Sequence, residues 1–233
     1  MALPPPVIEK HEGFTVIRDD ALSGGTKRRV LNDYLGTLEA DEFVYPSTPY
    51  GMGPVAIAYA CRDLGKQATL FYPQRKRERF TEQMETVLKL GAKIELVPHG
   101  YMSVVKARTR EYAEKTDAHL LPLGLAIPEV QNALTKIAKD LPVLPKQVWC
   151  ATGTGTLTRA LQAAWPKAEH HAVLVAMEPT ASLGTAITHK AAEDFAQSAR
   201  ILPPYNSLPQ YDAKVWQFVS TQGRKGALIW NVA

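Results

Sequence analysis

The chain alternates between strand-like and helix-like segments almost from end to end, and this alternation restricts its fold more than any other feature. Short segments rich in β-branched or aromatic residues favour strands: Glu42–Tyr45, Ala68–Tyr72, Lys93–Val97, Val148–Ala151 and His171–Ala176. Apolar residues recur at helical spacing in the segments around them: Gly53–Leu64, Arg79–Leu90, Ser103–Lys115, Pro128–Lys139 and Thr156–Trp165. This alternation predicts an α/β fold with parallel strands covered by helices on both faces.

The C-terminal part of the chain departs from the pattern. The proline-rich segment Leu202–Pro209 cannot form a helix or a central strand, because proline lacks a backbone N–H donor. We expect an ordered loop there. A short helix or strand is predicted near Tyr211–Val219, followed by a last strand near Ala227–Trp230.

The composition is that of a soluble globular protein, since 45% of the 233 residues are hydrophobic and 21% are charged. No apolar run approaches the roughly 20 residues that span a bilayer, so no membrane association is expected. The first residues, Met1–Lys10, hold three prolines and no apolar core, so a secretory signal is not expected. The net charge of +4 is small for a dedicated DNA-binding domain, but it favours an anionic ligand.

The cysteines and histidines give no sign of a metal site. Cys61 and Cys150 lie far apart among apolar residues, which is typical of reduced core thiols in a cytoplasmic protein. Five histidines lack the spacing of zinc ligands, and we expect them in loops or on the surface: His99, His119, His170, His171 and His189.

A glycine-rich turn, Ser23-Gly24-Gly25-Thr26-Lys27-Arg28-Arg29, precedes a helical run from Val30 to Leu38. The glycines let the backbone turn tightly and leave room beside it for a ligand. A lysine at the start of a helix lies in a positive field, which lowers its pKa and favours the neutral, nucleophilic amine. Lys27 therefore suits Schiff-base formation with an aldehyde cofactor. The alternative is a glycine turn followed by solvated basic residues.

A second segment places a glycine–threonine loop between a buried strand and a helix. The strand Val148–Ala151 is followed by Thr152, Gly153, Thr154, Gly155 and Thr156, where the helix begins. Backbone N–H groups and hydroxyls converge on a phosphate in such a loop, aided by the helix dipole. The loop matches neither a P-loop nor a Rossmann fingerprint. The alternative is a tight turn without a ligand.

In a third segment, a strand runs into a hydroxyl-rich loop and then into a helix with Pro54 in its first turn, a favoured position. Ser47 and Thr48 could offer hydroxyl and N–H groups to a carboxylate at that helix start. The alternative is a capped helix without a ligand.

In this order, the segments resemble the fold type II pyridoxal-phosphate enzymes, the tryptophan synthase β-like superfamily. The resemblance covers residues 15–180 and rests on Gly-Gly-x-Lys-x-Arg at 24–29 and Ala-x-Ala-Tyr-Ala-Cys-Arg-x-Leu-Gly at 56–65. It also rests on Tyr-Pro at 72–73, Leu-Gly-Ala-Lys-Ile-Glu-Leu-Val at 90–97 and the glycine–threonine loop. The 24–29 motif is most similar to the aminocyclopropane-carboxylate deaminase and D-cysteine desulfhydrase branch.

The resemblance implies two α/β lobes, each a mostly parallel sheet flanked by helices. A smaller lobe at 41–112 would be inserted in a larger cofactor-binding lobe made of 1–40 and 113–233. Within these lobes the resemblance makes Lys27 the catalytic, cofactor-bonded lysine, and Ser47 and Thr48 the substrate-carboxylate loop. The phosphate-binding loop would consist of Thr152, Gly153, Thr154, Gly155 and Thr156.

The chain departs from the family at two places. Tyr50 falls where members often place an Asn or His that touches the cofactor ring, so it is assigned here to substrate binding. The usual C-terminal partner of the pyridine nitrogen is not recognisable, and Ser220, Thr221 and Asn231 are candidates to replace it.

The resemblance implies a pyridoxal 5'-phosphate-dependent lyase that breaks a bond at the α-carbon of an amino acid. Short members also occur in bacteriophages, where some resemble enzymes that trim amino acids attached to thymine during DNA hypermodification. A decarboxylase acting on such a nucleotide or DNA is therefore expected, as a homodimer in the host cytoplasm. The basic residues at 75–79 agree with a phosphate-binding patch, although a solvated helix face is the alternative. The competing functions are a free amino acid deaminase or lyase, a non-catalytic binder of a phosphorylated ligand, and a phosphoribosyltransferase-like protein.

Overall fold

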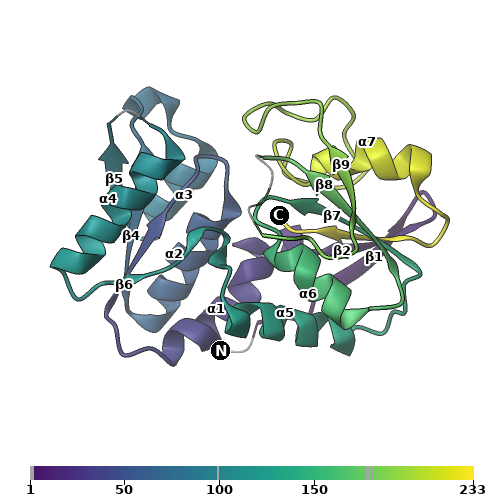
Figure 1. The fold of residues 1–233 in the computed structure, drawn as a ribbon, viewed down its shortest axis with the longest axis horizontal. Helices are drawn as coiled ribbons and strands as arrows, with labels where there is room; N and C mark the ends of the chain where they lie inside the picture. The colour runs from purple at the N-terminus through teal and green to yellow at the C-terminus, as the bar shows by residue number, and fades with distance from the viewer. Residues whose placement is uncertain (1–2, 99, 177–178, 180) are drawn as a thin grey trace. The chain divides into compact units, whose positions relative to one another are not determined.

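The computed structural model describes residues 3–98, 100–176, 179 and 181–233. Contacts between Cα atoms divide the chain into two compact units. Unit 1 consists of Met1–Thr26 and Pro128–Ala233, and unit 2 consists of Lys27–Ile127. Each unit contains a sheet with helices on both of its faces (Figure 1).

The sheet of unit 1 has the strand order β1-β2-β10-β7-β8-β9. All neighbouring strands run parallel except β1 and β2, which form an antiparallel hairpin. The strands are β1 (Val7–His11), β2 (Phe14–Arg18), β7 (Gln147–Thr152), β8 (Glu169–Leu174), β9 (Ile187–Lys190) and β10 (Leu228–Asn231). Its helices are α5 (Pro128–Asp140), α6 (Thr156–Ala164) and α7 (Ala213–Gln222).

The alternation of side chains along β7 explains why unit 1 is covered on both faces. Val148 and Cys150 pack in one apolar cluster with Leu157 and other residues of α5 and α6. Trp149 points to the opposite face, where it packs in a second cluster with Trp216 and other residues of α7. Figure 1 shows α6 and α7 on opposite sides of the strands. A strand buried on both faces is the arrangement that parallel sheets require.

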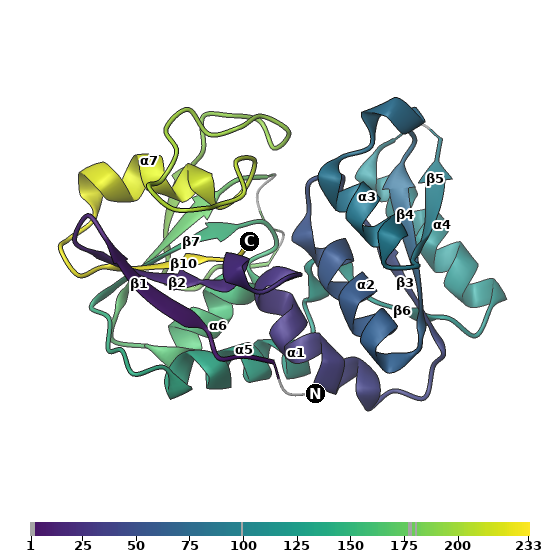
Figure 2. The same cartoon turned by 180° about the vertical axis from the view of Figure 1, so that it is seen from behind.

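Unit 2 contains a fully parallel sheet with the order β5-β4-β3-β6. The strands are β3 (Glu42–Pro46), β4 (Gln67–Pro73), β5 (Lys93–Val97) and β6 (His119–Leu120). The helices are α1 (Gly25–Gly36, whose first residues belong to unit 1), α2 (Met52–Leu64), α3 (Glu82–Lys89) and α4 (Met102–Lys115). Helix α4 covers one sheet face, where Val105 packs with Val44 and Phe71, and α2 and α3 cover the other (Figure 2).

The predicted α/β fold with mostly parallel strands is confirmed, and the five strands predicted from the 42–176 segments form within two residues of the expected ends. The hairpin of β1 and β2 was not predicted. Helix α1 begins at Gly25 rather than Val30, and α3 begins at Glu82 rather than Arg79, because Thr81 caps α3 by accepting a hydrogen bond from Met84 N at 3.3 Å.

Of the five histidines expected in loops or on the surface, His99 lies outside the described residues, and the expectation is wrong for His170 and His171. Both lie buried in β8, and the His171 ring stacks on Trp149 with the ring centres 3.9 Å apart. Residues His170 to Leu174 of β8 are all buried, so this strand is covered on both faces and both neighbouring histidines are buried whatever their residue type. The buried positions predicted for Cys61 and Cys150 are confirmed.

The unit boundaries at Thr26 and Ile127 extend beyond the lobe predicted at 41–112. Helix α1 belongs mostly to unit 2 because Arg28 forms an ion pair with Asp63 at 2.8 Å and Lys66 Nζ donates to Leu35 O at 3.1 Å. The predicted division of function between lobes remains a prediction.

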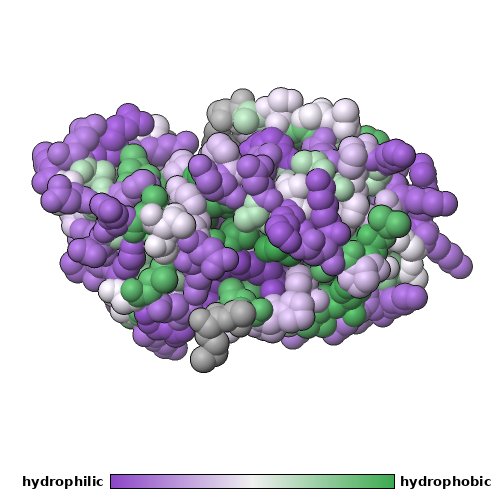
Figure 3. Space-filling view, turned by 90° about the horizontal axis from the view of Figure 1, so that it is seen from below, coloured by the Kyte–Doolittle hydropathy of each residue, from purple (hydrophilic) through white to green (hydrophobic). Residues whose placement is uncertain are grey.

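Over the described ranges, no helix is long and apolar enough to cross a bilayer. Figure 3 shows hydrophilic residues over most of one face, with hydrophobic residues in separate patches.

Candidate functional site

The glycine–threonine loop of unit 1 connects the carboxyl end of β7 to the first residue of α6. Gly155 has φ 82°, a left-handed conformation that L side chains rarely adopt. A Cβ atom there would collide with Leu183 Cδ2 and would lie 2.8 Å from Arg159 Nη1. Glycine is therefore strongly favoured at the point where the chain turns into the helix.

The start of α6 offers donors for an anion. The N-cap residue of this helix is Gly155, which has no side chain that could cap the N–H groups of the first turn. Thr154 Oγ1 and Thr156 Oγ1 lie 3.4 Å apart at the helix start, and Thr152 Oγ1 is held 2.8 Å from Thr158 Oγ1. Hydroxyls, the N–H groups of the first helical turn and the positive end of the helix dipole together form an arrangement that suits a phosphate.

The turn before Lys27 is anchored in unit 1. Gly25 has φ 68°, and a Cβ atom there would collide with Val232 O, so the turn requires glycine. Thr26 N donates to the same Val232 O at 3.1 Å, and Thr26 Oγ1 donates to Asp19 Oδ2 at 2.7 Å. Lys27 follows directly, so its backbone begins at an anchored position.

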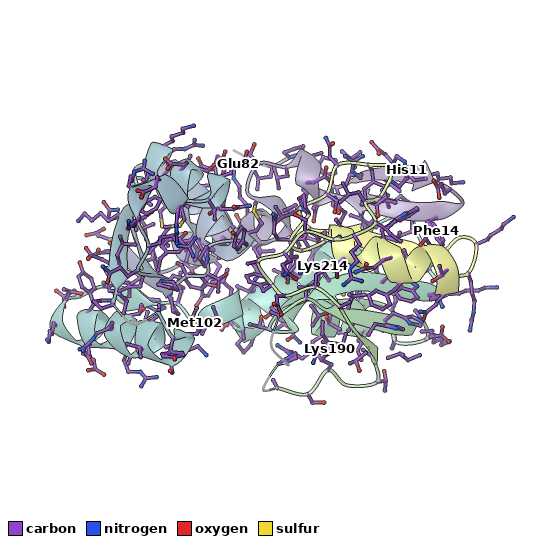
Figure 4. The ribbon with its side chains drawn as sticks, turned by 90° about the horizontal axis from the view of Figure 1, so that it is seen from above. His11, Phe14, Glu82, Met102, Lys190 and Lys214 are labelled. Atoms are coloured by element: carbon purple, nitrogen blue, oxygen red, sulfur yellow. The ribbon has the colours of Figure 1, made fainter. Side chains whose placement is uncertain are left out.

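Lys27 is half-buried by its exposed surface. The surrounding protein nevertheless lowers the pKa of its amine from 10.5 to about 8 by desolvation, and within the described residues the amine has no hydrogen bond or ion pair. The buried Lys214 of α7 differs, since its Nζ donates to Asp194 O at 2.8 Å (Figure 4). Of these two desolvated amines, only Lys27 remains available for chemistry.

A buried carboxylate that sequence reasoning missed lies at the carboxyl edge of the unit 1 sheet. Asp212, just before α7, is 4% exposed, and its Oδ2 accepts a hydrogen bond from Ala233 N at 3.1 Å. Its Oδ1 is buried without a hydrogen-bond partner among the described residues. Burial raises the pKa of Asp212 well above its usual range. Residues 232–233 follow β10, and Ala233 contacts Asp212. Because β10 runs parallel to β7, Asp212 shares the sheet edge at which β7 enters the glycine–threonine loop.

No local pattern marks Asp212 in the sequence, because its burial depends on the chain end 21 residues later. Ser220 and Thr221 lie exposed at the other end of α7. The Asn231 side chain donates to Asp20 Oδ1 at 2.7 Å and accepts from Ser207 Oγ at 2.7 Å. Its amide is therefore used within the protein.

In unit 2, Ser47, Thr48 and Tyr50 occupy the loop between β3 and α2. Ser47 is fully buried, and its Oγ donates to Tyr45 O at 3.2 Å, so this hydroxyl also holds the loop. Thr48 and Tyr50 are partly exposed. Gly51 precedes α2 without a side-chain cap, which leaves N–H groups at the helix start for an anionic ligand.

The structure thus brings Thr152–Thr156 together in one unit and Ser47, Thr48 and Tyr50 together in the other. Lys27 is the first residue of unit 2, directly after the anchored Thr26. The predicted role of these residues in one common site remains a prediction.

Comparisons with known proteins support the reading of the fold. No family model matches the chain. A glycyl-dTMP PLP-dependent decarboxylase of Pseudomonas phage M6 is 25% identical over 213 residues, which cover 76% of each chain.

Solved structures are similar over nearly the whole chain. An ACC deaminase homologue is 12% identical, with a TM-score of 0.82 over 100% of this chain and 90% of that one. Threonine deaminase isoform 2 of Solanum lycopersicum is 15% identical, with a TM-score of 0.69 over 98% and 83%. Diaminopropionate ammonia lyase of Escherichia coli is 14% identical, with a TM-score of 0.68 over 94% and 77%. The chain therefore has the fold of the fold type II pyridoxal-phosphate enzymes, as the sequence predicted.

Proposed function

We propose that this chain is a pyridoxal 5'-phosphate-dependent lyase that acts at the α-carbon of an amino acid, with Lys27 as the catalytic lysine. The observation that carries the proposal is an unpartnered lysine with a pKa of about 8, placed directly after a glycine turn that is anchored through Thr26. When bound, the cofactor supplies an aldehyde for the amine and a ring that accepts electrons from the α-carbon.

The residues present fit this cofactor. The N–H groups at the start of α6 and the hydroxyls of Thr154 and Thr156 would hold its phosphate. The unpaired Asp212 Oδ1 would accept a hydrogen bond from the protonated ring nitrogen, which supports electron withdrawal from the α-carbon. In this role Asp212 would take the place of Ser220, Thr221 and Asn231, because its Oδ1 is a buried acceptor without a partner among the described residues.

The remaining roles belong to Lys27 and to the loop after β3. Thr48, Tyr50 and the start of α2 would orient the substrate, while Ser47 holds their loop. Once the substrate amine has displaced it, Lys27 Nζ would carry a proton. A pKa near 8 lets this group exchange between amine and ammonium at neutral pH.

We further propose that the bond broken is the one between the α-carbon and the carboxylate of an amino acid attached to a thymine nucleotide. Carbon dioxide would leave, and the Lys27 ammonium would deliver a proton to the α-carbon. The similarity to the phage decarboxylase supports this substrate. Because the Ser47 hydroxyl donates to Tyr45 O, it is engaged within the protein and would hold the substrate carboxylate only weakly, which agrees with a reaction in which this carboxylate leaves. A homodimer in the cytoplasm of a phage-infected host completes the proposal.

The second candidate is a deaminase or lyase of free amino acids, which the structural similarity to the ACC deaminase homologue and to threonine deaminase favours. The two candidates differ in substrate and product rather than in the role of Lys27.

Spectroscopy and mass spectrometry test the proposal. Purified protein with pyridoxal phosphate should be yellow, and borohydride reduction should leave the cofactor attached to the peptide that contains Lys27. Lys27→Ala should abolish both signals, whereas Lys139→Ala, an exposed lysine of α5, should retain them. A colourless wild type, or attachment at another lysine, would refute the assignment.

Product analysis separates the candidates. Amino-acid-modified thymidine nucleotides or DNA should lose carbon dioxide, and free amino acids should be unchanged. Turnover of free amino acids alone would replace the first candidate by the second. Gel filtration measures the proposed dimer.

A further inference from the structure

Unit 2 contains a pocket in which only one lining residue, Tyr50, has a role in the proposed reaction. Its volume is about 790 Å³, within the range of about 300–1,000 Å³ for small-molecule sites, and it is lined by Tyr50, Gln74, Arg75, Lys76 and Arg79. Tyr50 follows the carboxyl end of β3, and residues 74–79 follow the carboxyl end of β4. Ligands of parallel α/β sheets bind at this edge of the strands. The pocket is therefore at the position in unit 2 where a ligand is expected.

The lining of the pocket is basic and carries no acid. Among the described ion pairs, none involves Arg75, Lys76 or Arg79, whereas the neighbouring Arg77 is paired with Glu85. Glu78 is exposed and does not line the pocket. Uncompensated positive charges in a concave surface concentrate anions there.

The guanidinium of Arg75 is only partly bonded within the protein. Arg75 Nε is inaccessible to solvent and makes no hydrogen bond in the described structure, and Arg75 Nη1 donates to Arg79 O at 3.3 Å. The terminal N–H groups of a guanidinium without a carboxylate partner are suited to a phosphate, which they bind through charge-assisted hydrogen bonds.

We propose that this pocket binds the phosphate of the nucleotide that carries the substrate amino acid, with Arg75, Lys76 and Arg79 as its ligands. The ring of Tyr50 at the pocket offers a surface on which a base can stack. The identity of the anion as a nucleotide phosphate rests on the proposed function. The shared chemistry is a phosphate ester, and its source is either a mononucleotide or a DNA strand.

Fluorescence anisotropy with a fluorescein-labelled single-stranded thymidine oligonucleotide tests the site in the cofactor-loaded protein. The double variant Lys76→Ala/Arg79→Ala removes two exposed charges from the pocket. The matched control Lys106→Ala/Arg110→Ala removes the same residue types from the exposed surface of α4. We expect the pocket variant to weaken binding by about tenfold or more and the control by less than about twofold. Equal weakening by both variants would overturn the proposal.

Competition identifies the group that is bound. Thymidine monophosphate should displace the oligonucleotide, and thymidine should not, because it lacks the phosphate. Direct binding of thymidine monophosphate without oligonucleotide binding would identify a mononucleotide source, and tight oligonucleotide binding with weak competition would identify DNA. Both outcomes support a phosphate site, provided that the pocket variant loses the binding that is observed in the wild type. Equal competition by thymidine would refute it.

The yellow absorbance separates this proposal from the proposed function. The pocket variant should keep the absorbance of the Lys27-bound cofactor while losing the nucleotide. A colourless wild type that binds nucleotide through the pocket would refute the cofactor role of Lys27 and leave the phosphate site supported.

Discussion

The lowered pKa of Lys27 predicts an unusual reactivity toward amine reagents in the cofactor-free protein. With a pKa of about 8 instead of 10.5, about a quarter of Lys27 is neutral near pH 7.5, against about 0.1% of an ordinary lysine. The neutral fraction of Lys27 is therefore about 240 times that of an ordinary lysine. If nucleophilicity falls with pKa as it does for thiols, about tenfold of this advantage is lost. A net acceleration of about twentyfold remains.

Reductive methylation followed by peptide mass spectrometry measures this reactivity at each pH, with an N-acetyl-lysine amide as the reference amine. The labelling rate of Lys27 should rise with pH through a midpoint near 8, because only the neutral amine reacts. The pH midpoint of labelling is the decisive quantity, because restricted access of the reagent lowers the labelling rate without shifting this midpoint. A midpoint above about 10 would show that Lys27 is solvated, and the physical basis of its proposed role would be lost.

Three further perturbations test the environment of the site. Because the pKa of Asp212 is raised, the folded carboxyl keeps its proton above pH 3.8, where the unfolded carboxyl releases it, so the free energy of unfolding of the cofactor-free protein should fall as pH rises. Urea unfolding at several pH values should show a weaker pH dependence for Asp212→Asn. An unchanged pH dependence would contradict the burial of this carboxyl. Gly155→Ala should lower the free energy of unfolding by about 1–3 kcal/mol and weaken phosphate binding, because a φ of 82° strains any side chain there. Calorimetry without and with cofactor measures the stability and the binding. An unchanged Tm would show that this position is not strained. Trp230→Phe should lower the free energy of unfolding, measured with urea, by about 1–3 kcal/mol, because Trp230 Nε1 donates a hydrogen bond to the buried Asp19 at 3.0 Å. A loss under about 0.5 kcal/mol would mean that this hydrogen bond contributes little to stability.

Local patterns were sufficient to predict most of the elements. The apolar period of Pro128–Asp140 and the β-branched and aromatic residues of β4 indicated helix and strand correctly, since such signals lie within one turn or one pleat. The order of glycine and threonine residues at 152–156 placed a strand–loop–helix junction correctly for the same reason. The candidate roles of Lys27 and the loop were also available from the sequence, through the order of the motifs.

Long-range contacts decided the rest. Trp230 lies 211 residues from Asp19, yet their hydrogen bond helps to hold the turn before Lys27. The orphaned oxygen of Asp212, the burial of His171 and the joining of Tyr50 with Arg75 in one pocket likewise depend on which distant segments pack together. Periodicity and propensity describe neighbours along the chain, whereas desolvation and unmet hydrogen bonds are properties of three-dimensional surroundings. The amino-acid order could therefore indicate the residues at which chemistry is expected, but only the folded chain defines the electrostatic state of these groups.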